Sequence, residues 1–193
     1  MLNLASDTNP KWLQQAQEGL DLVLIDHAHC EKKAAAYAMR MLDTYITNRP
    51  LTEKMTEIVE EELEHFHQVL ALLEERNIKF RTLKPSSYGK RLHELVSKKE
   101  PQRAVDLLLV ASLIEARSCE RFKRLAEHIR PTEPKVADFY ESLFESEARH
   151  HTTYVKLAFD YQPEGAVLDR LKELAQEEAK ILALGDNFAR MHS

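Results

Sequence analysis

Two short motifs of the same type lie 85 residues apart in this 193-residue chain. Glu62-Leu-Glu-His65 and Glu147-Ala-Arg-His150 each place a carboxylate and an imidazole one helical turn apart. A lone glutamate precedes each motif at nearly the same distance: Glu31 lies 31 residues before Glu62, and Glu115 lies 32 residues before Glu147. Four carboxylates and two imidazoles from four helices are the ligand set of a carboxylate-bridged di-iron or di-manganese centre. The internal repeat therefore predicts two halves of one metal site.

A third match to the motif, Glu64-His-Phe-His67, makes helical phase the deciding criterion. At 3.6 residues per turn, Glu62 and His65 share a helix face with apolar residues from Met55 to Leu73. Glu64 and His67 share theirs with glutamates and a glutamine. We therefore expect the first pair to point into the core and the second pair to face solvent.

The same phase test places the other three glutamates on apolar stripes. A single inward glutamate is usually partly exposed or paired in a salt bridge, and a buried carboxylate without a partner costs several kcal/mol. Four of them at repeated spacing are explained by a pair of bound metal ions, which remove that cost. The predicted metal ligands are Glu31, Glu62, His65, Glu115, Glu147 and His150.

Other side chains near the predicted ligands have two interpretations. His27 lies one turn before Glu31 on the same face, either as a hydrogen-bond partner of that ligand or as a helix-packing histidine. Cys119 lies one turn after Glu115, either as a neighbour of the metal site or as a small core residue. His29 and His151 are expected at the surface or at its rim.

The elements that must hold these ligands are helices. The chain has four glycines, seven prolines, 44% hydrophobic residues and no run of β-branched residues typical of a strand. Caps and prolines predict helices over residues 11–19, 20–46, 52–76, 90–97, 102–128, 135–161 and 166–184. Short turns near Pro50 and Pro131 make two antiparallel hairpins, joined by a long connection over residues 77–100. We expect an all-α, ferritin-like four-helix bundle with extra short helices, in a single domain over residues 1–193.

Composition excludes several classes of protein. The longest apolar stretch spans about eight residues, too short to cross a membrane. No secretory signal is evident, and two cysteines provide no disulfide framework, so a cytoplasmic location is expected. The net charge of −5 conceals a basic connection, because residues 76–103 contain nine basic residues and only two acidic ones. This connection is either a solvated loop or a surface for an anionic partner.

The sequence blocks around the first, second and fourth ligands resemble one family. These blocks are Asp26-His-Ala-His-Cys-Glu31-Lys-Lys-Ala-Ala, Glu61-Glu62-Leu-Glu-His65-Phe and Glu115-Ala-Arg-Ser-Cys-Glu120-Arg-Phe. They are similar to the bacterial MiaE-type tRNA hydroxylases, which act on 2-methylthio-N6-isopentenyladenosine. The resemblance covers essentially the whole chain, and the family's ligands fall on the six residues chosen above by phase.

That resemblance implies a non-haem di-iron monooxygenase that uses two iron ions and dioxygen to hydroxylate the isopentenyl side chain of a modified adenosine in tRNA. By likeness to related centres, Glu62 and Glu147 would bridge the two metals, and Glu31 and Glu115 would each bind one. Electrons must come from a reductase or a ferredoxin, because the chain has no Cys-x-x-Cys motif and no nucleotide-binding glycine loop.

A tRNA substrate would give the basic connection a role in phosphate neutralisation. The candidate tRNA-binding residues are Lys84, Lys90, Arg91, Lys98, Lys99 and Arg103. Tyr88 and Phe80 lie among them, either to stack on a base or to pack in the core. The competing functions are a ferritin-like ferroxidase or iron store, a peroxide-handling di-metal protein, and a metal-free bundle that binds a partner.

Overall fold

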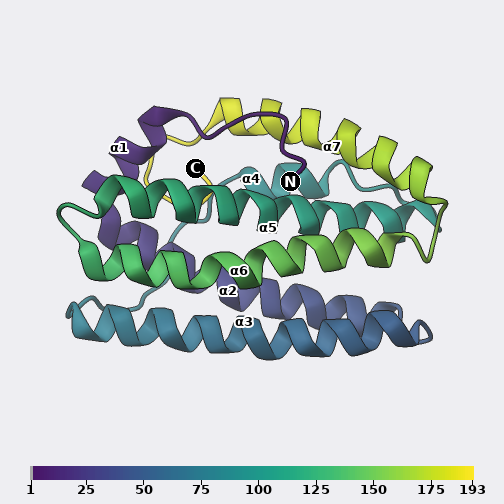
Figure 1. Ribbon diagram of the computed structural model, residues 1–193, viewed down its shortest axis with the longest axis horizontal. Helices are drawn as coiled ribbons and strands as arrows, with labels where there is room; N and C mark the ends of the chain where they lie inside the picture. Colours follow the sequence, from purple (N-terminus) through teal and green to yellow (C-terminus); the bar gives the residue numbers. More distant parts are fainter. Residues whose placement is uncertain (1) are drawn as a thin grey trace. The chain divides into compact units, whose positions relative to one another are not determined.

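The computed structural model describes residues 2–193, and this part of the chain is all-helical, without a strand (Figure 1). The helices are α1 (Pro10–Glu18), α2 (Leu20–Thr44), α3 (Arg49–Glu75), α4 (Tyr88–His93), α5 (Gln102–Ile129), α6 (Pro134–Ala158) and α7 (Glu164–Leu184). The predicted all-α class is confirmed. None of the described helices is long and apolar enough to span a membrane.

Proline lies in the first turn of α1, α3 and α6, and the predicted start of the α3 helix at residue 52 was wrong. α3 begins at Arg49 instead of residue 52, because Asn48 caps it: its side chain accepts a hydrogen bond from the Leu51 amide at 3.0 Å. Pro50 lies in the first turn, where a missing N–H leaves no hydrogen bond unmade. α6 begins at Pro134 for the same reason.

The short helix of the long connection is also shifted. α4 covers Tyr88–His93 rather than residues 90–97. After His93 the chain turns back, and the amide of Ser97 donates to Asp106 Oδ2 at 2.8 Å. Asp106 is fully buried and also accepts from Arg170 Nε at 2.9 Å. The long-range contact with this carboxylate replaces the last turn that local sequence preference predicts.

The chain forms two compact units. The α2–α3 unit contains residues 18–85 and 189–191, and the α5–α6 unit contains the remaining described residues, with α1, α4 and α7. Each unit is built on one antiparallel hairpin, and a short turn joins its two long helices (Figure 1). The expectation of a single domain over residues 1–193 stays a prediction.

Small residues let the helices of the α2–α3 unit approach closely. Ala28, Ala35 and Ala38 are buried along α2, and Met55 and Leu73 are buried along α3. Burial of apolar area stabilises such a hairpin by about 25 cal/mol per Å². Each helical turn along the buried faces of α2 and α3 holds an apolar side chain or one of the predicted ligands.

Helix α5 is the central element of the α5–α6 unit. Most of its residues are buried, and it packs against α6, α7 and α4. Its buried charges were not predicted from the sequence. Arg117 is fully buried and donates from Nε and Nη2 to the buried Glu178 of α7, each at 2.9 Å. Tyr88 donates its hydroxyl hydrogen to the same carboxylate, also at 2.9 Å. A shared carboxylate thus joins α4, α5 and α7.

Candidate metal centre

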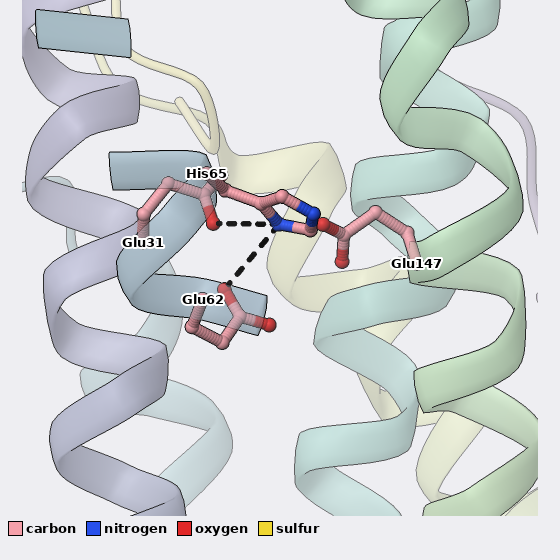
Figure 2. Close-up of side chains that lie close together, drawn as sticks. All are labelled: Glu31, Glu62, His65 and Glu147. Carbon is pink, nitrogen blue, oxygen red and sulfur yellow. Dashed lines mark ion pairs between the residues drawn. The ribbon is translucent and has the colours of Figure 1, made fainter. Parts of the chain in front are cut away.

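The α2–α3 unit contains the first cluster of potential ligands. Glu31 comes from α2, and Glu62 and His65 come from α3, with each residue between 1% and 6% exposed. Each offers one ligand atom, and these atoms lie within 4.8 Å of one another. His65 Nδ1 is 3.7 Å from Glu31 Oε2 and 4.0 Å from Glu62 Oε2 (Figure 2, dashed lines). We call these three residues the first triad.

The α5–α6 unit contains a second cluster of the same composition. Glu115 comes from α5, and Glu147 and His150 come from α6, with each between 2% and 6% exposed. Their ligand atoms also lie within 4.8 Å of one another, and His150 Nδ1 is 3.8 Å from Glu147 Oε2. We call these residues the second triad. The predicted repeat of one glutamate plus one Glu-x-x-His pair therefore recurs in the structure, once in each unit.

The donor set of each triad fits an iron or manganese ion. Two carboxylates and one imidazole are oxygen and nitrogen donors of the kind that bind these metals. With metal–ligand bonds of about 2.0–2.2 Å, two donors on one ion lie at most about 4.4 Å apart. The separations within each triad are close to this limit. Two carboxylates buried at such range repel each other and lose hydration, and a cation between them offsets both costs.

Helical phase also distinguished the buried Glu-x-x-His pair of α3 from an exposed pair with the same spacing. Glu64 and His67 are exposed on the outer face of α3, as predicted, although they fit the same Glu-x-x-His pattern. Their exposure means that they need no partner to offset burial. The burial of Glu62 and His65, three residues apart in the same helix, is therefore a property of the face and not of the motif.

His27 and Cys119 contact or adjoin the triads within their own units. His27 is fully buried, and its Nε2 forms an ion pair with Glu31 Oε1. The Cys119 thiol donates to the carbonyl of Phe144 at 3.6 Å. Burial, and then the charges of Glu147 and Glu115, raise the pKa of Cys119 well above its ordinary value. Their roles beside bound metal stay predictions.

The expectation that His151 lies at the surface was wrong. His151 is buried, and its Nδ1 lies 2.7 Å from Ser112 Oγ and 3.0 Å from the Ser112 carbonyl oxygen. Burial lowers the pKa of His151, although the hydrogen bond to Ser112 opposes that shift. No local sequence pattern indicates this contact, because Ser112 lies on another helix. His29 is half-buried, as expected for the rim, with its Nε2 2.9 Å from the carbonyl oxygen of Arg81.

Both aromatic residues of the basic connection pack within the protein. Tyr88 is buried and stacks on His192, with ring centres 4.9 Å apart and planes 7° from parallel. The ring centre of Phe80 lies 5.8 Å from that of Phe66, in an edge-on contact, and 4.7 Å from that of His29. Both rings therefore pack against other side chains of the protein, which is the second of the two predicted roles. The Arg117–Glu178 pair that fixes Tyr88 was missed, because no periodicity relates residues 61 positions apart.

The structure distributes the candidate tRNA-binding residues over both units. Lys84 belongs to the α2–α3 unit, and the other five belong to the α5–α6 unit. Lys84, Lys90, Lys98 and Lys99 are exposed, and Arg91 and Arg103 are half-buried. Lys90 lies 4.0 Å from Glu94, and Arg103 lies 3.4 Å from Glu100. Exposed cations with such weak local pairing can neutralise phosphates, and their contact with tRNA stays a prediction.

Comparison with known families decides between the classes of metal protein that share such triads. Residues 2–193 match the family model described as tRNA-(MS[2]IO[6]A)-hydroxylase (MiaE). The chain belongs to the MiaE family. The match extends over both units and both triads, and so includes all six predicted ligands.

Two curated relatives agree with membership of the MiaE family. A tRNA 2-(methylsulfanyl)-N(6)-isopentenyladenosine(37) hydroxylase from Pseudomonas putida is 36% identical over 190 residues, covering 98% of this chain and 91% of the relative. A hydroxylase of the same name from Salmonella typhimurium is 29% identical, covering 100% of this chain and 88% of the relative. This chain is thus similar to these hydroxylases over nearly its whole length.

A solved structure shares the fold of this MiaE-family chain. It is described as protein 43 with aldehyde deformylating oxygenase activity from Synechococcus, and it is 42% identical with a TM-score of 0.94. The similarity covers 98% of this chain and 95% of the solved one. The predicted ferritin-like helical fold is confirmed. The buried glutamate and histidine clusters of this chain are compatible with a di-iron site.

Proposed function

We propose that this chain is a non-haem di-iron monooxygenase that hydroxylates the isopentenyl side chain of 2-methylthio-N6-isopentenyladenosine in tRNA. The observation that carries the proposal is the pair of buried triads of identical composition in a chain of the MiaE family. Membership of a hydroxylase family favours this function over a ferroxidase, a peroxide-handling protein or a metal-free bundle. The substrate comes from the names of the relatives in Pseudomonas putida and Salmonella typhimurium.

The six triad residues are the proposed ligands of two iron ions. Four carboxylates carry four negative charges, which equal the charge of two divalent ions, so a centre of this composition is neutral inside a low-dielectric core. By the family resemblance, Glu62 and Glu147 would each help to hold both ions, and Glu31 and Glu115 would each help to hold one. His65 and His150 each supply one ring nitrogen.

The remaining chemistry of the site divides between the metal and the protein. Reduced iron, when bound, supplies the activation of dioxygen that no amino-acid side chain performs. The chain's own contribution is to orient ligands and exclude water. His27 holds Glu31 through its ion pair, and the triad residues are at most 6% exposed, so little solvent reaches them. Electrons come from a separate reductase or ferredoxin in this proposal.

Metal analysis of ligand variants tests the site. The purified protein is expected to hold about two irons per chain. Glu62→Ala and Glu147→Ala each remove one carboxylate of a triad and are expected to lower the iron content to one ion or fewer. The matched control is Glu64→Ala, which changes the exposed glutamate of the Glu64–His67 pair on α3 and should leave iron content unchanged. Equal iron content in all three variants contradicts the ligand assignment.

Nucleoside analysis tests the reaction. Bulk tRNA from cells that contain the gene should carry the hydroxylated nucleoside, and tRNA from cells without it should carry only the unhydroxylated precursor. Complementation with the Glu62→Ala variant should fail, whereas the Glu64→Ala variant should restore the product. Hydroxylated nucleoside at the same level in cells without the gene overturns the substrate assignment and leaves the metal assignment standing.

One observation favours a second candidate function. The solved Synechococcus protein has aldehyde deformylating oxygenase activity in its description, and it is 42% identical to this chain. The second candidate is therefore oxidation of an aldehyde at the same pair of triads. Iron-loaded protein with a reductant should be offered modified tRNA and, separately, aldehydes. Aldehyde consumption without hydroxylation of the tRNA selects the second function, and the opposite result selects the first.

A further inference from the structure

The ring of Tyr88 is a fixed platform within the α5–α6 unit. Its hydroxyl donates to Glu178 Oε1 at 2.9 Å, and Arg117 holds the same carboxylate with two hydrogen bonds of 2.9 Å. All three residues are buried, and none of these bonds involves the chain's last two residues. The position and plane of the ring are therefore set by α4, α5 and α7, independently of what stacks on it.

His192 covers one face of that platform. Its imidazole stacks almost parallel on Tyr88, and its Nε2 lies 3.5 Å from Ser118 Oγ. A heteroaromatic ring thus makes two contacts here, one through its face and one through a ring nitrogen at its edge. These are also the two contacts by which proteins hold an unstacked nucleobase: an aromatic side chain under the face and a hydroxyl at the edge.

The surroundings of the platform suit a nucleotide that reacts at the second triad. Ser118 lies three residues after Glu115 on α5, so their side chains are neighbours on one helix face. Lys90 and Arg91 lie two and three residues after Tyr88 and give α4 positive charge. A base that took the place of His192 would have phosphate-binding cations near its backbone and a ligand glutamate near its edge.

The segment that carries His192 is not helical, and hydrogen bonds hold its residues within each unit. In the α5–α6 unit, Arg121 Nη2 donates to the carbonyl of Ser193 at 2.9 Å. In the α2–α3 unit, the Met191 amide donates to Asp26 Oδ2 at 3.0 Å, and Arg190 Nε donates to the Lys84 carbonyl at 2.8 Å. Residues 189–193 are buried, so release of His192 requires these hydrogen bonds to be exchanged for contacts with the RNA.

We propose that Tyr88 and Ser118 form the subsite for the adenine base of the substrate, and that His192 occupies this subsite until tRNA displaces it. The inference rests on the proposed function, because the base is that of the modified adenosine. Its N6 substituent extends from the edge of the purine. A base with that edge at Ser118 directs the isopentenyl group along α5 toward Glu115. The purine covers more of the Tyr88 ring than an imidazole does, which favours the exchange.

Two substitutions at His192 give opposite predictions. The substrate is an anticodon stem-loop RNA that carries 2-methylthio-N6-isopentenyladenosine, and its hydroxylation is followed with the iron-loaded protein. His192→Ala removes the competitor and should lower KM about threefold or more. His192→Trp stacks more strongly on Tyr88 and should raise KM by a similar factor. Both effects fall on KM rather than on kcat. A purely structural role of His192 would move both variants in the same direction, and that result overturns the inference.

Variants of the platform complete the test. Tyr88→Leu removes the aromatic face and should raise KM about tenfold or more, since stacking on an aromatic side chain contributes strongly to base binding. Tyr88→Phe keeps the ring and should stay within threefold of wild type, so it reports on the platform even when the leucine variant fails to fold. The matched control is His93→Ala, an exposed histidine at the end of α4, which should leave KM unchanged.

The two levels of the proposal fail in distinguishable ways. Wild-type protein that does not hydroxylate the modified stem-loop refutes the proposed function. Wild-type protein that hydroxylates it, while the His192→Ala and His192→Trp variants keep the wild-type KM, leaves the function standing and refutes only the base subsite.

Discussion

Substitution of Glu178 by glutamine tests how much the buried charges of the α5–α6 unit contribute to stability. Glu178 accepts three hydrogen bonds, two from Arg117 and one from Tyr88, and both partners are buried. Burial lowers the pKa of Arg117, but the hydrogen bonds and charge of Glu178 outweigh burial and raise it above its ordinary value. Arginine stays charged in proteins at neutral pH, so in the Glu178→Gln variant the guanidinium keeps its charge and loses its main counter-ion.

The expected loss follows from the contacts that remain. Removal of one partner of a buried ion pair costs about 3–5 kcal/mol. Arg117 retains Glu120 at 3.0 Å, so its charge keeps some compensation and the cost should fall at the lower end of this range. We expect a loss of about 3 kcal/mol in the free energy of unfolding. In a chain of this size that loss lowers Tm by about 6–12 °C.

Urea unfolding followed by circular dichroism at 222 nm, with a chelator present, measures this loss. The matched control is Glu177→Gln, the preceding residue of α7, whose ion pair with Lys180 is exposed to solvent. Surface pairs of this kind contribute less than about 1 kcal/mol. A Glu178→Gln variant that is no less stable than the Glu177→Gln variant would refute the argument that the buried carboxylate stabilises the unit by balancing Arg117.

Three further predictions concern separate features. Iodoacetamide at pH 8 should label the half-buried Cys30 and spare Cys119, because a raised thiol pKa keeps Cys119 protonated and unreactive until the pH exceeds that pKa; peptide mass spectrometry measures both, and equal labelling contradicts it. Asn48→Ala should lower stability by about 1 kcal/mol in urea unfolding, since it removes the cap of α3, and an unchanged midpoint contradicts the assigned cap. Reversal of Lys98 and Lys99 to glutamate should weaken tRNA binding and reduce its salt slope by about 2, with iron content unchanged. An unchanged slope excludes these exposed lysines from phosphate contact.

The burial of the predicted ligands could be predicted from the sequence because helical periodicity is a local property. Glu62 and Glu64 differ by two positions, or about 200° around the helix, so the apolar residues nearby decide which of them is buried. The same reasoning found Glu31, Glu115 and Glu147 on their stripes. Contacts between distant residues did not have to be known, because the apolar periodicity within each helix identifies its buried face.

The residues that sequence reasoning missed depend on contacts between distant segments. His151 follows His150 by one position and is buried only because Ser112 on another helix meets it. Glu178 and Tyr88 meet across 90 residues, and neither has a local pattern that points to the other. The predicted start of α3 was wrong for a different reason. Asn48 and Pro50 have the chemistry of a cap and a first turn, but the same residues are also typical of a helix break.

All three residues of each triad come from a single helical hairpin, and this has a consequence for the proposed uptake of metal ions. In the proposed centre each hairpin brings three donors of its own, so we expect one ion to be taken up before the other. A titration with metal should then resolve two successive affinities instead of one concerted step.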